Sequence, residues 1–146
     1  MHPNEALLRA SYEALERGDW DAVRNTLAED FVLAVGGRNP LAGETRGRDA
    51  NIARQQRIVQ LLGGHPYHTE HIDTAVSNDR VFDYARVTYD LGGKPFTYTT
   101  VNVWRIEDGK LKEVRGHIFD LYAWDNLWTE ILASPEATSE ERSLRR

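Results

Sequence analysis

The sequence predicts an α+β domain: a cone-shaped, curved antiparallel (mixed) β-sheet wrapped around three N-terminal helices, with a short C-terminal helix. Apolar residues recur at helical spacing in most of the first 62 residues, and from Tyr67 the spacing changes to two, which is typical of strands. Gly92-Gly93 and Asp108-Gly109 divide the later part of the chain, and both pairs tolerate the positive φ of tight hairpins. Long antiparallel strands must twist and curl, so we expect a closed end filled by core and an open end with a cavity.

Two short helices are predicted at the start of the chain. The first opens at Pro3 or Asn4 and ends at Gly18, a residue suited to the left-handed C-cap. Asp19 caps the next helix at once. Because almost nothing separates the two helices, they must meet at a sharp angle. The buried stripe of the second helix is predicted to be Trp20, Val23 and Leu27.

The middle of the chain predicts one strand, one loop and one helix. Residues 31–35 read as a short buried strand, and residues 36–43 are rich in turn formers. Helical spacing resumes near Arg48 and stops at Gly63-Gly64.

The C-terminal half predicts an antiparallel meander and a closing helix. The four expected strands are 67–77, 80–91, 95–107 and 111–120. The helix is expected over 121–132, so the domain covers residues 1–133. Residues 134–146 are polar and charged and are expected to form a tail.

Composition excludes several classes of function. A chain of 146 residues with a formal charge of −5 suits a single domain and argues against nucleic-acid binding, which needs a basic face. The basic stretch from Arg46 to Arg57, which includes Arg54, is interpreted as the solvated side of a helix. No apolar run reaches the roughly 20 residues that cross a bilayer, so no membrane partner is expected. With no cysteine and no visible secretory signal, we expect a cytoplasmic protein without thiolate metal sites.

Six segments carry a family resemblance: Tyr12–Asp19, Leu27–Phe31, Gly37–Gly43, Arg46–Asp49, Trp104–Leu111 and Asp120–Asp125. Over about residues 3–132 the chain resembles the nuclear transport factor 2-like superfamily, and more narrowly its SnoaL-like branch, which is related to ketosteroid isomerases. The resemblance implies a curved-sheet cone that is usually dimeric. It does not imply one activity, because such relatives include isomerases, cyclases, dehydratases, epoxide hydrolases and non-catalytic binding proteins.

Strand alternation, in the register that the resemblance implies, separates a pocket face from an outer face. Arg115 and His117 are expected to face outward. The pocket face is expected to carry Tyr98, Thr100, Asn102 and Trp104 on one strand, Asp83, Ala85, Val87 and Tyr89 on its neighbour, and Val114, Gly116, Ile118 and Asp120 on the last.

Comparison with ketosteroid isomerases argues against that particular activity. Their chemistry needs a carboxylate base together with a tyrosine and a protonated aspartic acid that stabilise an oxyanion. The resemblance places the base on Val35, the tyrosine on or beside Ser11 with Tyr12 next to it, and the aspartic acid on Asn102. Asparagine can donate a hydrogen bond to an oxyanion, whereas valine cannot accept a proton.

Three residues are the catalytic candidates. Asp120 or Asp83 would carry a proton and Asn102 would polarise a carbonyl group. The alternatives are that Asp120 caps the helix that follows it and that Asp83 is an exposed charge near a sheet edge. His117 could pair with Asp120 only if a bulge brought them to one face of the strand.

Ligand contacts are expected from aromatic and amide side chains. Gln55 and Gln56 interrupt an apolar stripe, so they face either the pocket or solvent at its rim. In the loop 36–46, Arg38 and Arg46 could meet a ligand carboxylate. The expected binding residues are Tyr12, Trp20, Gln55, Tyr89, Tyr98, Trp104 and Ile118. His65, His68 and His71 lie three apart on a predicted strand with no carboxylate cluster, so no metal site is expected.

Three functions remain open at the level of sequence. The first is an acid–base enzyme without a cofactor, of the isomerase, cyclase or dehydratase type, acting on a small apolar molecule. The second is a non-catalytic carrier of an apolar metabolite, and the third is a dimerisation module with a vestigial pocket. A homodimer through the outer sheet face, with Val101 and Val103 as candidates, is compatible with all three.

Overall fold

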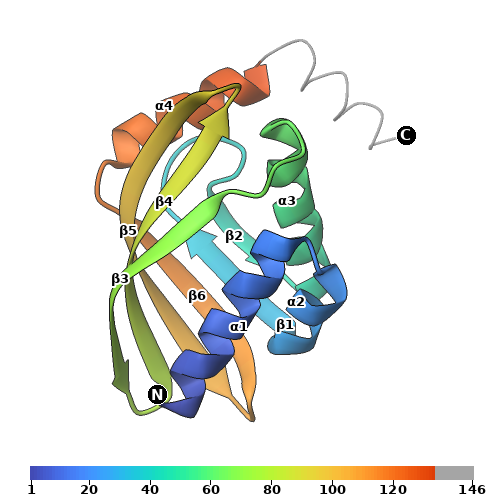
Figure 1. The fold of residues 1–146 in the computed structure, drawn as a ribbon, viewed down its shortest axis with the longest axis vertical. Coiled ribbons are helices and arrows are strands. Elements are labelled where there is room, and N and C mark those ends of the chain that lie inside the picture. Colours follow the sequence, from blue (N-terminus) through green and yellow to red (C-terminus); the bar gives the residue numbers. More distant parts are fainter. Residues whose placement is uncertain (134–146) are drawn as a thin grey trace.

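The computed structural model describes residues 1–133 and contains four helices and six strands in that range. In chain order they are α1 (Pro3–Arg17), α2 (Trp20–Thr26), β1 (Leu27–Val35), β2 (Gly43–Arg46), α3 (Arg48–Leu61), β3 (His68–Ser77), β4 (Arg80–Leu91), β5 (Lys94–Glu107), β6 (Lys110–Ile118) and α4 (Leu121–Ala133). Figure 1 shows α1, α2 and α3 on one face of the twisted sheet, with α4 across one end.

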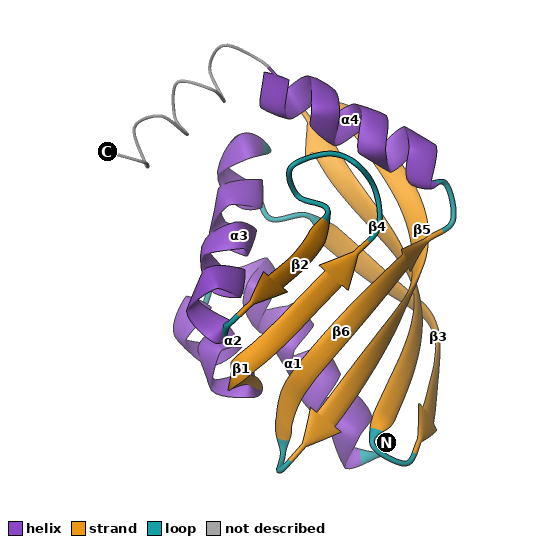
Figure 2. Cartoon of the chain, turned by 180° about the vertical axis from the view of Figure 1, so that it is seen from behind, coloured by secondary structure: helices purple, strands orange, loops and turns teal. Residues whose placement is uncertain are grey.

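All six strands form one mixed sheet in the order β2-β1-β6-β5-β4-β3. The pair β1 and β6 is parallel and every other pair is antiparallel. Figure 2, seen from behind, shows the long strands crossing at a steep twist with the first three helices on their far side. The α+β cone predicted from the sequence is therefore confirmed.

The predicted caps position the first two helices. Gly18 ends α1 with φ 71°, and its N–H donates to main-chain carbonyls of the last helical turn. Asp19 caps α2 by accepting a hydrogen bond from the Ala22 N–H at 3.1 Å. The turn between the helices is so tight that α1 and α2 both reach the concave side of the sheet, where the site forms.

Three features of the fold differ from the sequence prediction by more than one residue. Leu27 begins β1 and does not extend the helical stripe, since α2 ends at Thr26. The strand β2 was not predicted, because it is four polar residues long and pairs only with β1 at the sheet edge. The last strand ends at Ile118 and not at residue 120. The predicted tail, residues 134–146, lies outside the described residues.

Buried side chains form two clusters on the concave side. One includes Leu8, Phe31 and Leu111 beneath α1 and α2. The other includes Tyr89 of β4 and Trp128 of α4. Residues of both clusters line a cavity on this side of the sheet. Within residues 1–133, no helix has the length and apolar character needed to span a membrane.

Candidate functional site

A cavity of about 150 Å³ opens between the helices and the concave face of the sheet. The sheet contributes every second residue of β5 and β6, as the alternation predicted. The residues concerned are Tyr98, Thr100, Asn102 and Trp104 on β5, and Val114, Gly116 and Ile118 on β6. Arg115 and His117 are exposed on the opposite face, also as predicted.

Strand β4 lines the cavity only over its second half. Val87 and Tyr89 reach it, whereas Asp83 and Ala85 are fully buried but are not among the lining residues. The predicted inward orientation of β4 is therefore confirmed, but its first half is covered by α1 and β3, and its side chains belong to the packed interior.

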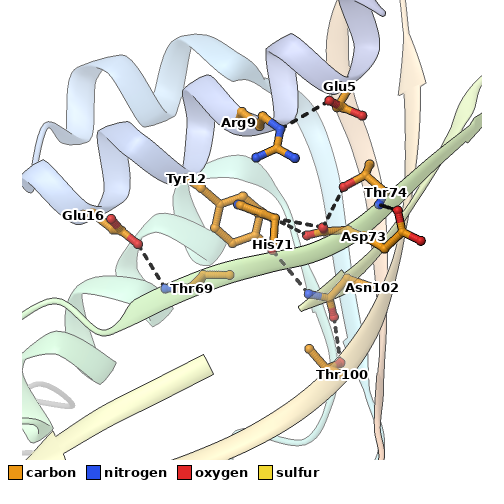
Figure 3. Close-up of polar contacts among 11 residues, drawn as sticks. Glu5, Arg9, Tyr12, Glu16, Thr69, His71, Asp73, Thr74, Thr100 and Asn102 are labelled. Atoms are coloured by element: carbon orange, nitrogen blue, oxygen red, sulfur yellow. Dashed lines mark hydrogen bonds and ion pairs between the residues drawn. The ribbon is translucent and has the colours of Figure 1, made fainter. Parts of the chain in front are cut away.

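Tyr12 and Asn102 meet in the cavity although 90 residues separate them. The Asn102 Nδ2 donates to the Tyr12 hydroxyl oxygen at 3.3 Å, and the Thr100 hydroxyl donates to Asn102 Oδ1 at 3.0 Å. Figure 3 shows this chain of contacts between α1 and β5. Burial, and then the negative charge of Asp83, raise the pKa of Tyr12 well above its ordinary value. Tyr12 is therefore a neutral hydrogen-bond donor at physiological pH.

The Tyr12 proton remains available to a ligand. Its oxygen accepts from Asn102, and no acceptor for its O–H is found in residues 1–133. Trp104 stands beside it, with ring centroids 5.8 Å apart, and a hydrogen bond from Trp104 opposes the larger rise in the Tyr12 pKa that burial causes. A donor without an acceptor in a cavity with largely apolar walls favours a ligand oxygen at this position.

Asp83 does not have the position expected of a proton carrier in the cavity. Both of its carboxylate oxygens lie 2.9 Å from the His71 Nδ1, and the Thr74 hydroxyl lies 3.4 Å from Oδ1. The His71 ring contacts the Tyr12 ring edge at 4.7 Å and so stands between Asp83 and the helix layer. The alternative of an exposed edge charge is equally wrong, since Asp83 is 0% exposed.

Asp120 is also outside the cavity. It is exposed in the turn after β6, and its Oδ1 accepts a hydrogen bond from the Ala123 N–H at 3.1 Å. Because β6 ends two residues earlier, the alternation that pointed Asp120 inward does not reach it. Asp120 therefore caps α4, which was the alternative to a catalytic role. His117 is exposed on the outer face, and the described part of the chain shows no hydrogen bond between it and Asp120.

The two glutamines of α3 have different positions. Gln55 lines the cavity, and its Oε1 accepts a hydrogen bond from the Tyr67 hydroxyl at 2.6 Å. Gln56 is exposed. The prediction for Trp20 is not supported, because Trp20 packs against the first core cluster and is not among the residues that line the cavity.

The loop after β1 is fixed to α4 by Asp125. One carboxylate oxygen accepts from the Arg38 N–H at 2.6 Å and from the Asn39 N–H and Nδ2 at 2.8 Å each. These hydrogen bonds lower the pKa of Asp125. Gly37 has φ 116°, and a Cβ there would lie 2.7 Å from the same oxygen, so only glycine fits.

The two arginines of this loop do not have the predicted position, because neither Arg38 nor Arg46 lines the cavity. Arg46 is exposed and pairs with Glu44 at 2.7 Å.

Arg54 is a cavity residue that the sequence analysis placed in solvent. It lies on α3, one turn before the buried Ile58, and both line the cavity. Its Nη2 donates to the Leu41 carbonyl at 3.1 Å, and its Nε is buried without a hydrogen-bond partner in the described chain. Burial lowers the pKa of Arg54. The spacing of four from Ile58 was the available indication that Arg54 shares its face.

Aromatic hydroxyl groups complete the wall on the side of α4. The Tyr89 and Tyr98 hydroxyls lie 3.2 Å apart, and the Trp124 Nε1 donates to Tyr89 at 3.3 Å. Burial raises the pKa of Tyr67, Tyr89 and Tyr98, so all three phenols are neutral at physiological pH.

The histidines of the 65–71 segment separate in space. His71 pairs with Asp83, and the His68 Nδ1 lies 3.1 Å from Glu16 Oε1. In residues 1–133 no group of three or more His, Cys, Asp or Glu side chains could hold a metal ion.

The sequence also matches a known family. The SnoaL-like domain family matches residues 8–114, which is more than half of the chain. The protein therefore belongs to this family, in the SnoaL-like branch of the nuclear transport factor 2-like superfamily. A comparison with curated proteins gives no match.

Solved structures give the same result for the fold. Bal32a, from a soil-derived mobile gene cassette, is 30% identical with a TM-score of 0.80, over 86% of this chain and 96% of its own. TerC, co-crystallised with polyporic acid, is 22% identical with a TM-score of 0.75, over 87% and 98%. An epoxide hydrolase-like protein of M. tuberculosis is 18% identical with a TM-score of 0.68, over 91% and 96%. The last two likenesses concern the fold alone.

Proposed function

We propose that this protein is a cofactor-free enzyme, of the isomerase, cyclase or dehydratase type, that holds the carbonyl oxygen of a small, largely apolar substrate. The observation that carries the proposal is the Tyr12 hydroxyl, whose oxygen accepts from Asn102 while its proton has no acceptor in the described chain. In an apolar cavity, such a preorganised donor stabilises negative charge that develops on a substrate oxygen. The family includes enzymes of these types, and this supports the class of chemistry.

The size of the cavity limits the substrate. A dry, apolar cavity of about 150 Å³ holds a molecule as large as benzene, and the volume here is about 150 Å³. We therefore propose a ligand with one ring or a short branched chain in the part that is enclosed. Residues such as Leu15, Phe31 and Ile58 would contact its apolar surface.

A carrier function is the second candidate, and one observation favours it. None of the described residues that line the cavity is aspartate, glutamate or histidine. The described wall of the cavity therefore supplies a donor but no general base, and a proton would have to leave to water or to a basic group of the substrate. A carrier needs only the cavity and the donor.

Replacing Tyr12 with phenylalanine should weaken the binding of a ketone and leave a hydrocarbon unaffected. Cyclohex-2-enone and cyclohexene are a suitable pair, measured by isothermal titration and by the shift of the thermal midpoint. Loss of one neutral hydrogen bond should raise the Kd of the ketone by up to about tenfold. Tyr122→Phe, at an exposed tyrosine of α4, is the matched control. Equal weakening of both ligands by Tyr12→Phe, or of neither, would contradict the proposed role of the hydroxyl.

Deuterium exchange separates the two candidate functions. Catalysis through an enol or enolate should exchange the protons beside the carbonyl of a bound ketone in D₂O, and NMR detects this without knowledge of the natural product. Tyr12→Phe should abolish the exchange that exceeds the buffer rate. Binding without exchange, across a panel of ketones, would favour the carrier.

We further propose a homodimer through the outer face of the sheet. Tyr84 on β4 and Val101 on β5 are register partners there, and their side chains are 43% and 39% exposed. Phe82 lies on the same face and is also exposed. Such neighbouring apolar side chains are typical of contact surfaces between copies of a chain.

A charge at this face should separate the copies. Val101→Glu is expected to lower the molar mass measured by light scattering from that of a dimer to that of a monomer. Ala53→Glu, at an exposed position of α3, should leave the mass unchanged. A wild-type protein that is monomeric at about 100 μM would refute the proposal.

A further inference from the structure

Arg54 gives the cavity a positive charge that no lining residue within the described range 1–133 balances. Of the described residues that line the cavity, it alone is charged; the others are apolar or neutral and polar. Surface arginines differ in this respect: Arg46, Arg80 and Arg86 each have a carboxylate oxygen within 3.1 Å. No ion pair of Arg54 with a carboxylate is found in residues 1–133.

The contacts of Arg54 leave part of its guanidinium unsatisfied. A guanidinium has five N–H donors, and a single one of them has a partner in residues 1–133, the Leu41 carbonyl at 3.1 Å. The Nε–H is buried without a partner. Because an unpaired charge is costly to remove from water, this partly buried guanidinium favours any ligand that brings an anion.

The tyrosine hydroxyls in the wall of the cavity are also compatible with an anionic ligand. The charge of Arg54 acts on Tyr67 and Tyr89, where it lowers the pKa against the larger opposite effect of burial. Burial keeps both phenols protonated, so they add no negative charge near Arg54. No carboxylate among the described wall residues would repel an anionic oxygen.

We propose that the ligand of this cavity carries one carboxylate group that pairs with Arg54, while its apolar ring or chain fills the remaining volume. The inference rests on the proposed function and narrows it, since it assigns a charge class to the ligand. Arg54 then determines specificity: it selects an acid over its neutral analogue, separately from the carbonyl contact of Tyr12.

The test compares two ligands of nearly equal shape and different charge. Cyclohexanecarboxylate and cyclohexanecarboxamide are titrated into the wild type, Arg54→Gln and the control Arg46→Gln, which removes an exposed arginine outside the cavity. The wild type should bind the carboxylate more tightly by about 10- to 100-fold, the value of one charge-assisted contact. Arg54→Gln should lose this preference and retain the affinity for the amide, and Arg46→Gln should behave as the wild type.

Other outcomes separate this inference from the proposed function. Equal affinity of the wild type for both ligands, or equal weakening of both by Arg54→Gln, would overturn the inference. If cyclohex-2-enone binds and the carboxylate does not, the inference fails and the carbonyl site stands. If none of the three compounds binds, both proposals fail for ligands of this class.

The stability of the empty protein provides a second test. Arg54→Met keeps the length of the side chain and removes the buried charge, so its thermal midpoint without ligand should be equal to or above that of the wild type. Addition of the carboxylate should raise the midpoint of the wild type and not that of the variant. A lower midpoint for empty Arg54→Met would show that the guanidinium is satisfied within the protein, which would overturn the inference.

Discussion

Replacing His71 with alanine is expected to lower the free energy of unfolding by about 3–5 kcal/mol. The Asp83 carboxylate that His71 contacts is 0% exposed, and both of its oxygens lie 2.9 Å from the His71 Nδ1. Removal of the ring leaves this carboxylate with the hydroxyl of Thr74 at 3.4 Å as its remaining side-chain partner in residues 1–133. Urea unfolding at pH 7, followed by circular dichroism, measures the change.

A double substitution shows whether the uncompensated charge is the cause. His71→Ala combined with Asp83→Leu removes both members of the pair, so the double variant should be more stable than His71→Ala alone. His68→Ala is the matched control on the same strand, because that histidine is exposed and pairs with Glu16 at the surface. We expect the control to cost less than about 1 kcal/mol. A double variant less stable than His71→Ala would contradict this explanation.

Replacing Trp128 with alanine is expected to cost about 3–5 kcal/mol in the free energy of unfolding. Trp128 is 0% exposed on α4, and its ring meets the Tyr89 ring edge to face with centroids 5.5 Å apart. Since Tyr89 lines the cavity, the variant should also bind ligand more weakly than the wild type.

The control for Trp128 is an exposed aromatic residue of the same helix. Tyr122→Ala removes a side chain that is 86% exposed, so the free energy of unfolding should change by no more than about 0.5 kcal/mol. Chemical denaturation of both variants makes the comparison. A loss below about 1 kcal/mol for Trp128→Ala would mean that α4 is not part of the cooperative unit.

Alternation in the strands was a sound guide to orientation. Tyr98 and Asn102 were predicted to face the pocket and do so, because successive side chains of a strand point to opposite faces. The same rule failed for Asp120, where the strand had already ended at Ile118. Alternation gives the side of the sheet, but it does not give the residue at which pairing stops.

Knowing which side chains point to the concave face also did not show which of them reach the cavity. Asp83 and Tyr89 share one face of β4, yet Asp83 is enclosed by His71 and the helix layer, and Tyr89 lines the cavity. Arg54 shows the opposite error: its charge suggested solvent, although its spacing from Ile58 places it on the inner face of α3. The charge of a side chain is therefore a weak guide to its exposure at a functional site, where a charged group can be buried although burial lowers stability.

The sequence by itself determined the order of elements and the helix caps, since these follow from local spacing and turn chemistry. It predicted the two faces of the long strands through alternation in the register that the family resemblance implies. Only the tertiary structure decided that the Tyr12 hydroxyl meets Asn102, that His71 pairs with Asp83, and that the guanidinium of Arg54 lies in the cavity. The Tyr12–Asn102 contact joins residues that are 90 apart in the chain, and the His71–Asp83 contact depends on the register of β3 against β4. The place of Arg54 depends on how α3 covers the curled sheet. Local sequence patterns do not determine how the sheet curls or which side chains it brings together.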